Sequence, residues 1–330
     1  MLVSDVPLNI NGFSPHNYNK TFYGAVPAHV AIERSLNVPL VRMLSQYNTG
    51  RFMSLLKSWG MTTLRFSEEH YGASLILGGA EGTLWDLSGM YASMSRVLKH
   101  YRTYNGRYNP ADIHPLTPFP AERKEPSVPL PIAGSPIRRS FPPRPVVHVR
   151  GDVRPEPSRG RADWQQFESM KRIAWKTGTS YGGRDAWAIG TTPRYVVGVW
   201  AGNASGEGRP GLTGVGNAAP VLFDLFSLLP GSEWFDLPYD ETLPLAICRN
   251  SGHKASPYCE QTDTLYMPLS GNNTGICPYH KLVHLSADGR YRSIVPASLS
   301  TDDQPPVVRA SSRTGVYYRN YHIDISRSLR

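Results

Sequence analysis

The chain has 330 residues, of which 40% are hydrophobic and 11% aromatic, and it carries a formal net charge of +9. That length allows one large domain and one small domain, each with an apolar core. Apolar runs stay short of the roughly 18–20 residues of a membrane span, and the first residues lack the basic and apolar segments of a signal peptide, so we expect a soluble fragment.

The positive charge is concentrated in one segment. Between Arg138 and Arg161, seven arginines accompany two acidic residues, and the same stretch is rich in proline. This composition is typical of a solvated linker and much less of a nucleic-acid-binding surface. We therefore interpret residues 111–160 as a Pro/Arg-rich, linker-like segment and expect no nucleic-acid partner.

The first elements predicted in chain order are short helices. Residues 1–26 show little periodicity and are interpreted as an extended approach to the first helix. Pro27 is well placed in the first turn of that helix, Pro39 opens a second one, and Phe52–Trp59 is interpreted as a third. The break between the first two helices predicts a tight loop.

A glycine-rich stretch, Leu75–Gly82, precedes the longest predicted helix. No Gly-Lys-Ser/Thr sequence follows it, so we interpret it as a turn and not as a phosphate-binding loop. Thr83 is the expected N-cap of an amphipathic helix whose apolar face runs from Leu84 to Leu98.

The second half of the chain predicts a sheet. A helix is expected at Trp164–Met170, then strands at Ile173–Gly178, Asp185–Gly190 and Tyr195–Gly202, and a helix at Ala219–Leu229. An antiparallel sheet flanked by helices gives an α+β fold class. We expect one domain over residues 1–235 and a small, turn-rich and β-rich accessory module over residues 243–330.

The stretch Lys176-Thr177-Gly178-Thr179 gives the strongest indication of function. On a strand edge it places an ammonium, hydroxyl groups and a bare backbone along one wall of a cleft. These groups suit an anionic peptide and the oxyanion of acyl transfer. We predict a catalytic Lys176, hydroxyl donors at Thr177 and Thr179, and a substrate backbone that lies along Gly178. The backbone amide of Thr179 is the expected oxyanion donor.

The loop between the first two helices carries a second element, Ser35-Leu36-Asn37. We predict that Ser35 relays a proton and that Asn37 holds an amide of the acyl donor. Taken alone, this element is explained by a capping loop, and Lys-Thr-Gly alone is explained by a strand that ends in a turn. The two elements together and in this order favour an acyl-transfer site.

Three longer stretches carry a family resemblance: Arg34–Pro39, Leu77–Leu87 and Trp175–Ser180. They resemble the transpeptidase domain of bifunctional class A penicillin-binding proteins, in particular the penicillin-binding protein 1C type. Arg184–Gly190 and Cys277–His280 are similar to that type as well. The resemblance implies a penicillin-binding protein/β-lactamase-like transpeptidase fold, incomplete here. It also implies D,D-transpeptidase chemistry on peptidoglycan stem peptides through a serine acyl-enzyme, binding of β-lactams, and no cofactor.

Several features of that family are expected to be missing. The family's nucleophile belongs to a Ser-x-x-Lys motif upstream of Ser-x-Asn, and residues 1–34 hold no such motif. Ser54-Leu55-Leu56-Lys57 has the spacing but lies after Ser-x-Asn in an amphipathic run, so we interpret it as a decoy. We expect no nucleophile in this chain and predict that it is inactive alone.

Other departures concern the ends and the middle of the chain. A glycosyltransferase domain and an N-terminal membrane anchor, which would hold the enzyme on the periplasmic side of the bacterial inner membrane, are expected to be missing. The C-terminal module is expected to be truncated. Residues 119–160 are interpreted as a divergent or out-of-frame stretch, because their composition breaks abruptly from the flanking sequence.

Three alternative functions remain open, and the third of them is a zinc-dependent function. A carboxypeptidase or β-lactamase relative shares the Lys-Thr-Gly element but hydrolyses the acyl-enzyme, and the Arg184–Gly190 strand favours the synthase type instead. A non-catalytic module that binds cell-wall peptides or β-lactams is the alternative from a different class. The missing nucleophile favours that alternative for the isolated chain.

The three cysteines, Cys248, Cys259 and Cys277, all lie late in the chain. In an exported protein two of them would pair. His280 adds a possible ligand for zinc, but Cys248 and Cys259 are not a close pair in the sequence. We therefore favour a structural disulfide or unpaired thiols over zinc, and we assign no metal ligand.

Overall fold

The computed structural model describes residues 2–10, 12–103, 109–119, 172–237 and 242–285, and four short strands between residues 292 and 323. In these ranges, every helix is too short or too polar to cross a membrane. Most of the Pro/Arg-rich segment, from residue 120 onward, and the helix expected at 164–170 lie outside the described residues.

The N-terminal residues form a hairpin. Strand β1 (Leu2–Asp5) pairs antiparallel with β2 (Gly24–Pro27), so the stretch that we interpreted as an extended approach is partly sheet. The carboxylate of Asp5 is fully buried and accepts hydrogen bonds from the side-chain amide of Asn17 at 2.9 and 3.0 Å. The backbone N–H of Tyr23 donates to the same carboxylate at 2.9 Å. These bonds fold the long connection back against β1.

The three helices predicted next are confirmed. A helical region follows the hairpin and consists of α1 (Ala28–Glu33), α2 (Asn37–Tyr47), α3 (Thr49–Ser58), α4 (Glu68–Tyr71) and the 3₁₀ helix η1 (Gly72–Leu77). The second helix begins two residues before Pro39, so Pro39 lies in its first turn. Proline is tolerated there, since an N–H in the first turn has no intrahelical partner. Leu44, Leu64, Tyr71 and Leu75 form the apolar core of this region.

The longest helix, α5 (Leu84–Thr103), begins as predicted. Thr83 accepts a hydrogen bond from the backbone N–H of Asp86 at 2.9 Å and so caps the helix. Residues 109–114, at the start of the expected linker, pack against this helix: Arg96 donates to the carbonyl of Asp112 at 2.8 Å, and His100 contacts the Asp112 carboxylate at 2.7 Å.

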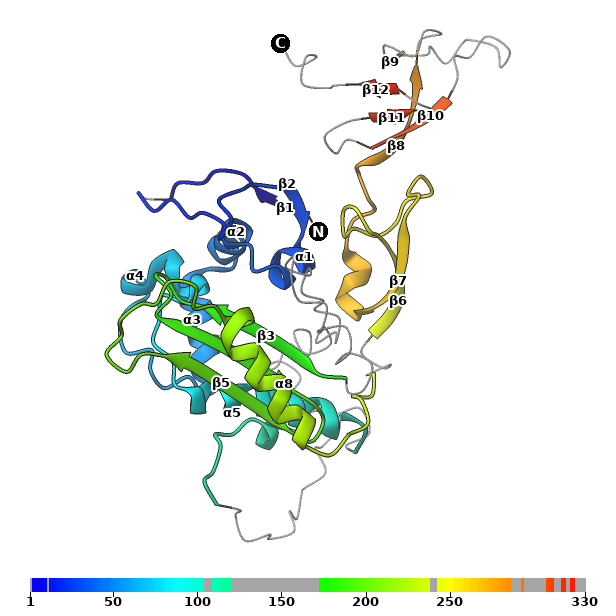
Figure 1. The fold of residues 1–330 in the computed structure, drawn as a ribbon. Coiled ribbons are helices and arrows are strands. Elements are labelled where there is room, and N and C mark those ends of the chain that lie inside the picture. The colour runs from blue at the N-terminus through cyan, green and yellow to red at the C-terminus, as the bar shows by residue number, and fades with distance from the viewer. Residues whose placement is uncertain are drawn as a thin grey trace.

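The central sheet has the order β3 (Ala174–Thr179), β4 (Asp185–Thr191), β5 (Val196–Gly202), all antiparallel. Helix α8 (Ala219–Leu228) covers one face and α5 covers the other (Figure 1). A Cβ atom at Gly198 would lie 2.9 Å from a methyl carbon of Leu84, so the glycine lets α5 approach β5 closely. The buried core between the sheet and α8 consists of Ala186, Ala188, Val199, Ala218, Ala219, Leu222 and Phe226. This arrangement confirms the α+β fold class.

The C-terminal residues form further antiparallel strands. The hairpin of β6 (Thr242–Cys248) and β7 (Thr262–Pro268) is followed by the 3₁₀ helix η6 (Leu269–Asn273). The remaining strands are β8 (His280–Leu285), β9 (Arg292–Ser293), β10 (Val307–Ser311), β11 (Val316–Tyr318) and β12 (Tyr321–Ile323). We refer to residues 242–285 as the C-terminal module, and its division from residues 1–235 stays a prediction.

Candidate functional site

Ser35 lies on the loop between α1 and α2, as the sequence predicts. Its backbone adopts the left-handed conformation with a φ of +52°, which costs a non-glycine residue about 1–2 kcal/mol. The loop tolerates this because the N–H of Leu36 bonds to the carbonyl of Ala31 at 2.9 Å and the side chain of Leu36 is buried beside Ala31 and Val26. The Ser35 side chain itself remains exposed. Strained backbone under an exposed polar side chain is typical of functional sites.

Asn37 begins helix α2 and is held by the N-terminal connection. Its side-chain amide donates to the carbonyl of His16 at 2.7 Å. The adjacent Asn17 accepts from the N–H of Val38 at 3.3 Å while its own amide binds Asp5. Sequence reasoning missed His16 and Asn17, since neither belongs to a motif. One amide hydrogen of Asn37 is used in the bond to His16, and its second amide hydrogen and its oxygen remain for a ligand.

Strand β3 carries Lys176, Thr177, Gly178 and Thr179 at one edge of the sheet β3–β4–β5. The N–H of Ser180 donates to the carbonyl of Asp185 on β4 at 3.0 Å. Backbone groups alternate in direction along a strand, so the N–H and C=O groups of Thr177 and Thr179 point away from β4. Beside β3, the N–H of Thr179 is therefore directed where a ligand backbone would add to the sheet.

The side chain of Lys176 joins the two sequence elements. Its ammonium donates to the hydroxyl of Ser35, which is 141 positions away in the chain, and to the carbonyl of Thr177 at 2.8 Å. Burial lowers the pKa of Lys176. A partly buried cation that contacts neutral oxygen atoms favours binding of an anion beside it. We call Ser35, Asn37 and Lys176–Thr179 the substrate wall.

A turn that begins with Gly214 contacts the side chain of Thr179. The N–H of Gly214, in the π-helical turn η4 (Gly214–Ala218), donates to the Thr179 hydroxyl at 2.9 Å. Since that oxygen accepts here, its own hydrogen is free to be donated to a ligand. A Cβ atom at Gly214 would lie 2.4 Å from the carbonyl oxygen of Gly178, so only glycine allows the turn to pack this closely on β3.

Serines with the Ser-x-x-Lys spacing lie in other surroundings. Ser54 is in the interior of α3, where its hydroxyl donates to the carbonyl of Gly50 at 2.9 Å. A second match, Ser251-Gly252-His253-Lys254, lies in the C-terminal module, where the Ser251 hydroxyl donates to the sulfur of Cys277 at 3.2 Å. Neither hydroxyl is bonded to a lysine in the way that Ser35 is bonded to Lys176.

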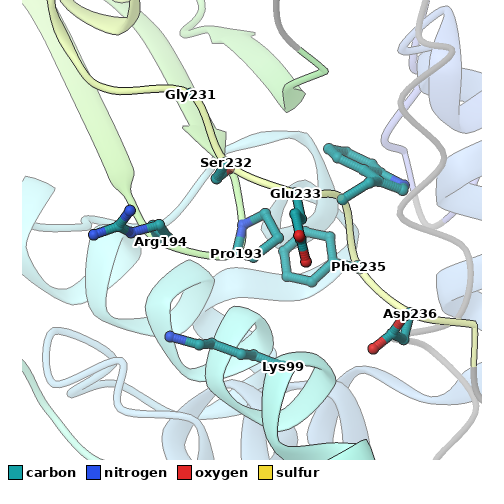
Figure 2. A pocket seen from close by; sticks show the side chains of 9 residues that line it. Lys99, Pro193, Arg194, Gly231, Ser232, Glu233, Phe235 and Asp236 are labelled. Carbon is teal, nitrogen blue, oxygen red and sulfur yellow. The ribbon is translucent and has the colours of Figure 1, made fainter.

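A hollow of about 450 Å³ is lined by other residues than those of the substrate wall (Figure 2). Lys99 of α5, the turn at Pro193 and Arg194, and residues 231–236 line it. Basic and acidic side chains both face this hollow, so it lacks the single sign of charge that would select an anionic peptide.

The cysteines converge in a way that their spacing did not predict. The sulfur atoms of Cys248, Cys259 and Cys277 and the ring nitrogen of His280 all lie within 4.8 Å of one another. All three thiols are free. Burial raises the pKa of Cys277, but hydrogen bonding with the side chains of Ser251 and His280 and with the backbone of Tyr279 and His280 outweighs it and lowers that pKa to about 6. We call these four residues the thiol cluster.

Comparison with known proteins relates the chain to cell-wall enzymes. No family model matches it. The sequence is 34% identical over 230 residues to penicillin-binding protein 1C of Escherichia coli K12, covering 69% of this chain and 26% of that protein. It is 26% identical over 305 residues to penicillin-binding protein 1A of Neisseria meningitidis serogroup B, covering 84% and 34%. The chain thus spans about a quarter to a third of the curated relatives it matches.

Among solved structures, penicillin-binding protein 1A from Haemophilus influenzae matches with a TM-score of 0.55 and 15% sequence identity, covering 82% of this chain and 44% of that one. At this identity the likeness supports the fold alone.

Proposed function

Since the chain belongs to the class A penicillin-binding proteins and is of their 1C type, we propose that its substrate wall binds the acyl-donor stem peptide of peptidoglycan and the β-lactams that imitate it. The domain is of the cell-wall transpeptidase type. The observation that carries the proposal is the bond between Lys176 and Ser35, which unites two motifs from distant parts of the chain.

Each residue of the wall has a role that follows from its contacts. The Lys176 ammonium attracts the terminal carboxylate of the peptide and keeps the Ser35 hydroxyl in place for proton relay. The Thr179 hydroxyl, held by Gly214, donates to the same carboxylate. The backbone N–H of Thr179 stabilises the oxyanion that forms when the acyl carbonyl is attacked. Asn37 contributes its remaining amide groups to the acyl donor, and Thr177 and Gly178 shape the strand edge.

The 330 residues by themselves are proposed to bind without forming an acyl-enzyme. The family's nucleophile precedes Ser-x-Asn, and residues 1–34 contain no Ser-x-x-Lys motif. A wall without a nucleophile holds a β-lactam reversibly, because ring opening needs an attacking oxygen. This makes a non-catalytic module for cell-wall peptides or β-lactams the second candidate for the isolated chain. The periplasmic side of the bacterial inner membrane is the proposed location.

Incubation with a penicillin, followed by intact-mass analysis and a separate reversible-binding titration, tests the proposal. We expect no covalent adduct, together with reversible binding that a peptide ending in D-Ala-D-Ala displaces. Lys176→Ala should abolish the reversible binding, whereas Lys57→Ala, at an exposed lysine of α3, should leave it unchanged. A stoichiometric adduct would contradict the absence of a nucleophile. Equal binding by both variants would contradict the role of the wall.

A further inference from the structure

We propose that Cys248, Cys259, Cys277 and His280 form a structural zinc site that holds the C-terminal module together. The four residues come from separate parts of the module: Cys248 ends β6, Cys259 precedes β7, and His280 begins β8 shortly after Cys277. They nevertheless place four donor atoms of the types that zinc prefers within 4.8 Å of one another.

The distances agree with tetrahedral coordination. The Nδ1 atom of His280 lies 3.4 Å from the sulfur of Cys248, 3.5 Å from that of Cys259 and 3.3 Å from that of Cys277. Zinc–sulfur bonds of about 2.3 Å and zinc–nitrogen bonds of about 2.0 Å at tetrahedral angles separate sulfur and nitrogen by about 3.5 Å. All three observed separations therefore fit a metal at the centre.

Hydrogen bonding alone does not account for this geometry. One imidazole nitrogen has either a single hydrogen or a single lone pair to offer, so Nδ1 can form one good hydrogen bond to a thiol and not three. A disulfide between two of the cysteines would leave the third sulfur and the imidazole crowded beside it. A cation with four ligands satisfies every donor at once.

The surroundings of the sulfur atoms resemble the outer shell of structural metal sites. The Ser251 hydroxyl donates to the sulfur of Cys277 at 3.2 Å, and the backbone N–H of Ser256 donates to that of Cys259 at 3.2 Å. The backbone N–H of Cys277 is in turn fixed by the carbonyl of Lys254 at 2.7 Å. Such bonds orient metal ligands and favour thiolates over thiols.

The module also has little else to stabilise it. Within its described residues, the buried apolar side chains are Ile247, Cys248 and Cys277, two of which belong to the thiol cluster. A small domain with so little apolar burial normally depends on a disulfide or a metal. Four protein ligands close the coordination sphere, as in structural and not catalytic zinc sites.

Zinc binding at this site releases protons and changes the charge of the thiol cluster. One Zn²⁺ replaces three thiol protons, which pass to solvent, and takes the lone pair of the neutral His280 Nδ1. Three thiolates and one divalent cation leave the site with a net charge of −1. No oxidant is required, in contrast to a disulfide.

The test is the metal content of the full 330-residue chain, exported to a bacterial periplasm and purified without added metal or reductant. Mass spectrometry of the metal should find one zinc per chain, and the thiols should resist alkylation until a chelator is added. Cys277→Ser and His280→Ala should each reduce bound zinc at least tenfold. The matched control is His253→Ala, because His253 belongs to the same module but lies outside the thiol cluster.

Two further measurements keep the result clear if the ligand variants do not fold. Cobalt(II) added to the metal-free chain should give the ligand-field absorption of a tetrahedral site with thiolate-to-metal charge transfer. His280→Cys should retain the metal with a stronger charge-transfer band, because a fourth thiolate replaces the imidazole. An exported, folded chain that contains a disulfide and no zinc would overturn the proposal, and so would zinc that persists in Cys277→Ser.

Discussion

The substrate wall and the thiol cluster are both built from residues that are distant in sequence, but they differ in the size of the apolar core beside them. The wall lies at the edge of a sheet whose faces are covered by α5 and α8, around an apolar core that includes Leu222 and Phe226. The cluster lies in a module whose described residues bury few apolar side chains. Beside the wall, buried Val26, Ala31 and Leu36 fix the loop that carries Ser35, so the polar Ser35 side chain can stay exposed. Where the apolar core is small, polar side chains have to hold the fold themselves.

Metal removal is the change that should separate the two regions most strongly. Chelation, or Cys277→Ser, should unfold the C-terminal module and leave the central sheet intact, because structural zinc in small domains contributes on the order of 10 kcal/mol. Hydrogen exchange should show lost protection in β6 and β7 and unchanged protection in β4 and β5. If chelation left the hydrogen-exchange protection of β6 and β7 unchanged, this dependence on the metal would be contradicted.

Asn17→Ala tests the support beneath the wall. Asn17 donates to the buried carboxylate of Asp5 and accepts from the N–H of Val38, so its loss leaves a buried charge with fewer donors and frees the start of α2. We expect a loss of about 3 kcal/mol in the free energy of unfolding and faster hydrogen exchange at Val38. Asn19→Ala is the control, since the Asn19 side chain is exposed and its hydrogen bonds, to the Tyr23 hydroxyl and from the N–H of Thr21, lie at the surface. Equal losses in both variants would refute a special role for Asn17.

Gly214→Ala probes the turn that holds Thr179. The added Cβ atom would approach two backbone carbonyl oxygens, those of Gly178 and Trp187, to 2.4 and 2.6 Å. Backbone cannot rotate away as a side chain does, so we expect a loss of about 1–3 kcal/mol in stability and weaker β-lactam binding. Gly231→Ala, where a Cβ atom would meet nothing within 4 Å, should leave both quantities unchanged. A Gly214→Ala chain with unchanged stability and β-lactam binding would show that the close packing of η4 on β3 is not required.

The fold was predictable where the sequence has periodicity or strong boundary residues. The strands β3 to β5 and the helices α2, α3, α5 and α8 follow from apolar patterns that Pro39, Thr83 and glycines delimit. The hairpin of β1 and β2 was missed because polar bonds between Asp5 and Asn17 define it, twelve positions apart. Such pairs leave no local signal.

The sites show the same division. Ser35 and Lys176 were identified from motifs, whereas His16, Asn17 and Gly214 were not. His16 and Gly214 act through their own backbone groups, and the Asn17 side chain bonds to residues 12 and 21 positions away, so no local sequence pattern reveals them. Sequence spacing disfavoured a metal, since Cys248 and Cys259 are not a close pair. Spacing along the chain says little when separate strands and turns converge in space, as the 3.4 Å contact between Cys248 and His280 illustrates.

Lys176→Met should separate ligand binding from stability. Burial lowers the pKa of Lys176, so between its folded and unfolded pKa values the unfolded chain binds more protons, and this lysine's contribution to stability rises with pH. Below the folded pKa the cost of burying the charge is fully present. Replacing the charge with an apolar chain should therefore stabilise the fold by about 1 kcal/mol at neutral pH and abolish binding of carboxylate ligands.

The wild-type chain provides the pH control for this variant. Its reversible binding of a β-lactam should weaken as pH rises toward the lowered pKa of Lys176, because the ammonium that attracts the carboxylate loses its proton. Lys57→Met should alter neither property, as Lys57 is exposed in the last turn of α3. Binding that stays constant up to the pKa of an ordinary lysine would contradict a buried cation in the wall.

Ser54→Ala should have the smallest effect, although Ser54-Leu55-Leu56-Lys57 is the match to the family's nucleophile motif that lies nearest to Ser-x-Asn. The Ser54 hydroxyl bonds to its own helix at Gly50, and the side chain is exposed, so stability should change by less than about 0.5 kcal/mol. β-lactam binding should be unaffected, whereas Ser35→Ala should weaken it by removing the oxygen that Lys176 contacts. If Ser54→Ala lost β-lactam binding and Ser35→Ala did not, the ligand site would have to be placed at α3 and not at the sheet edge. The motif's spacing would then be a better guide than the contacts of its hydroxyl.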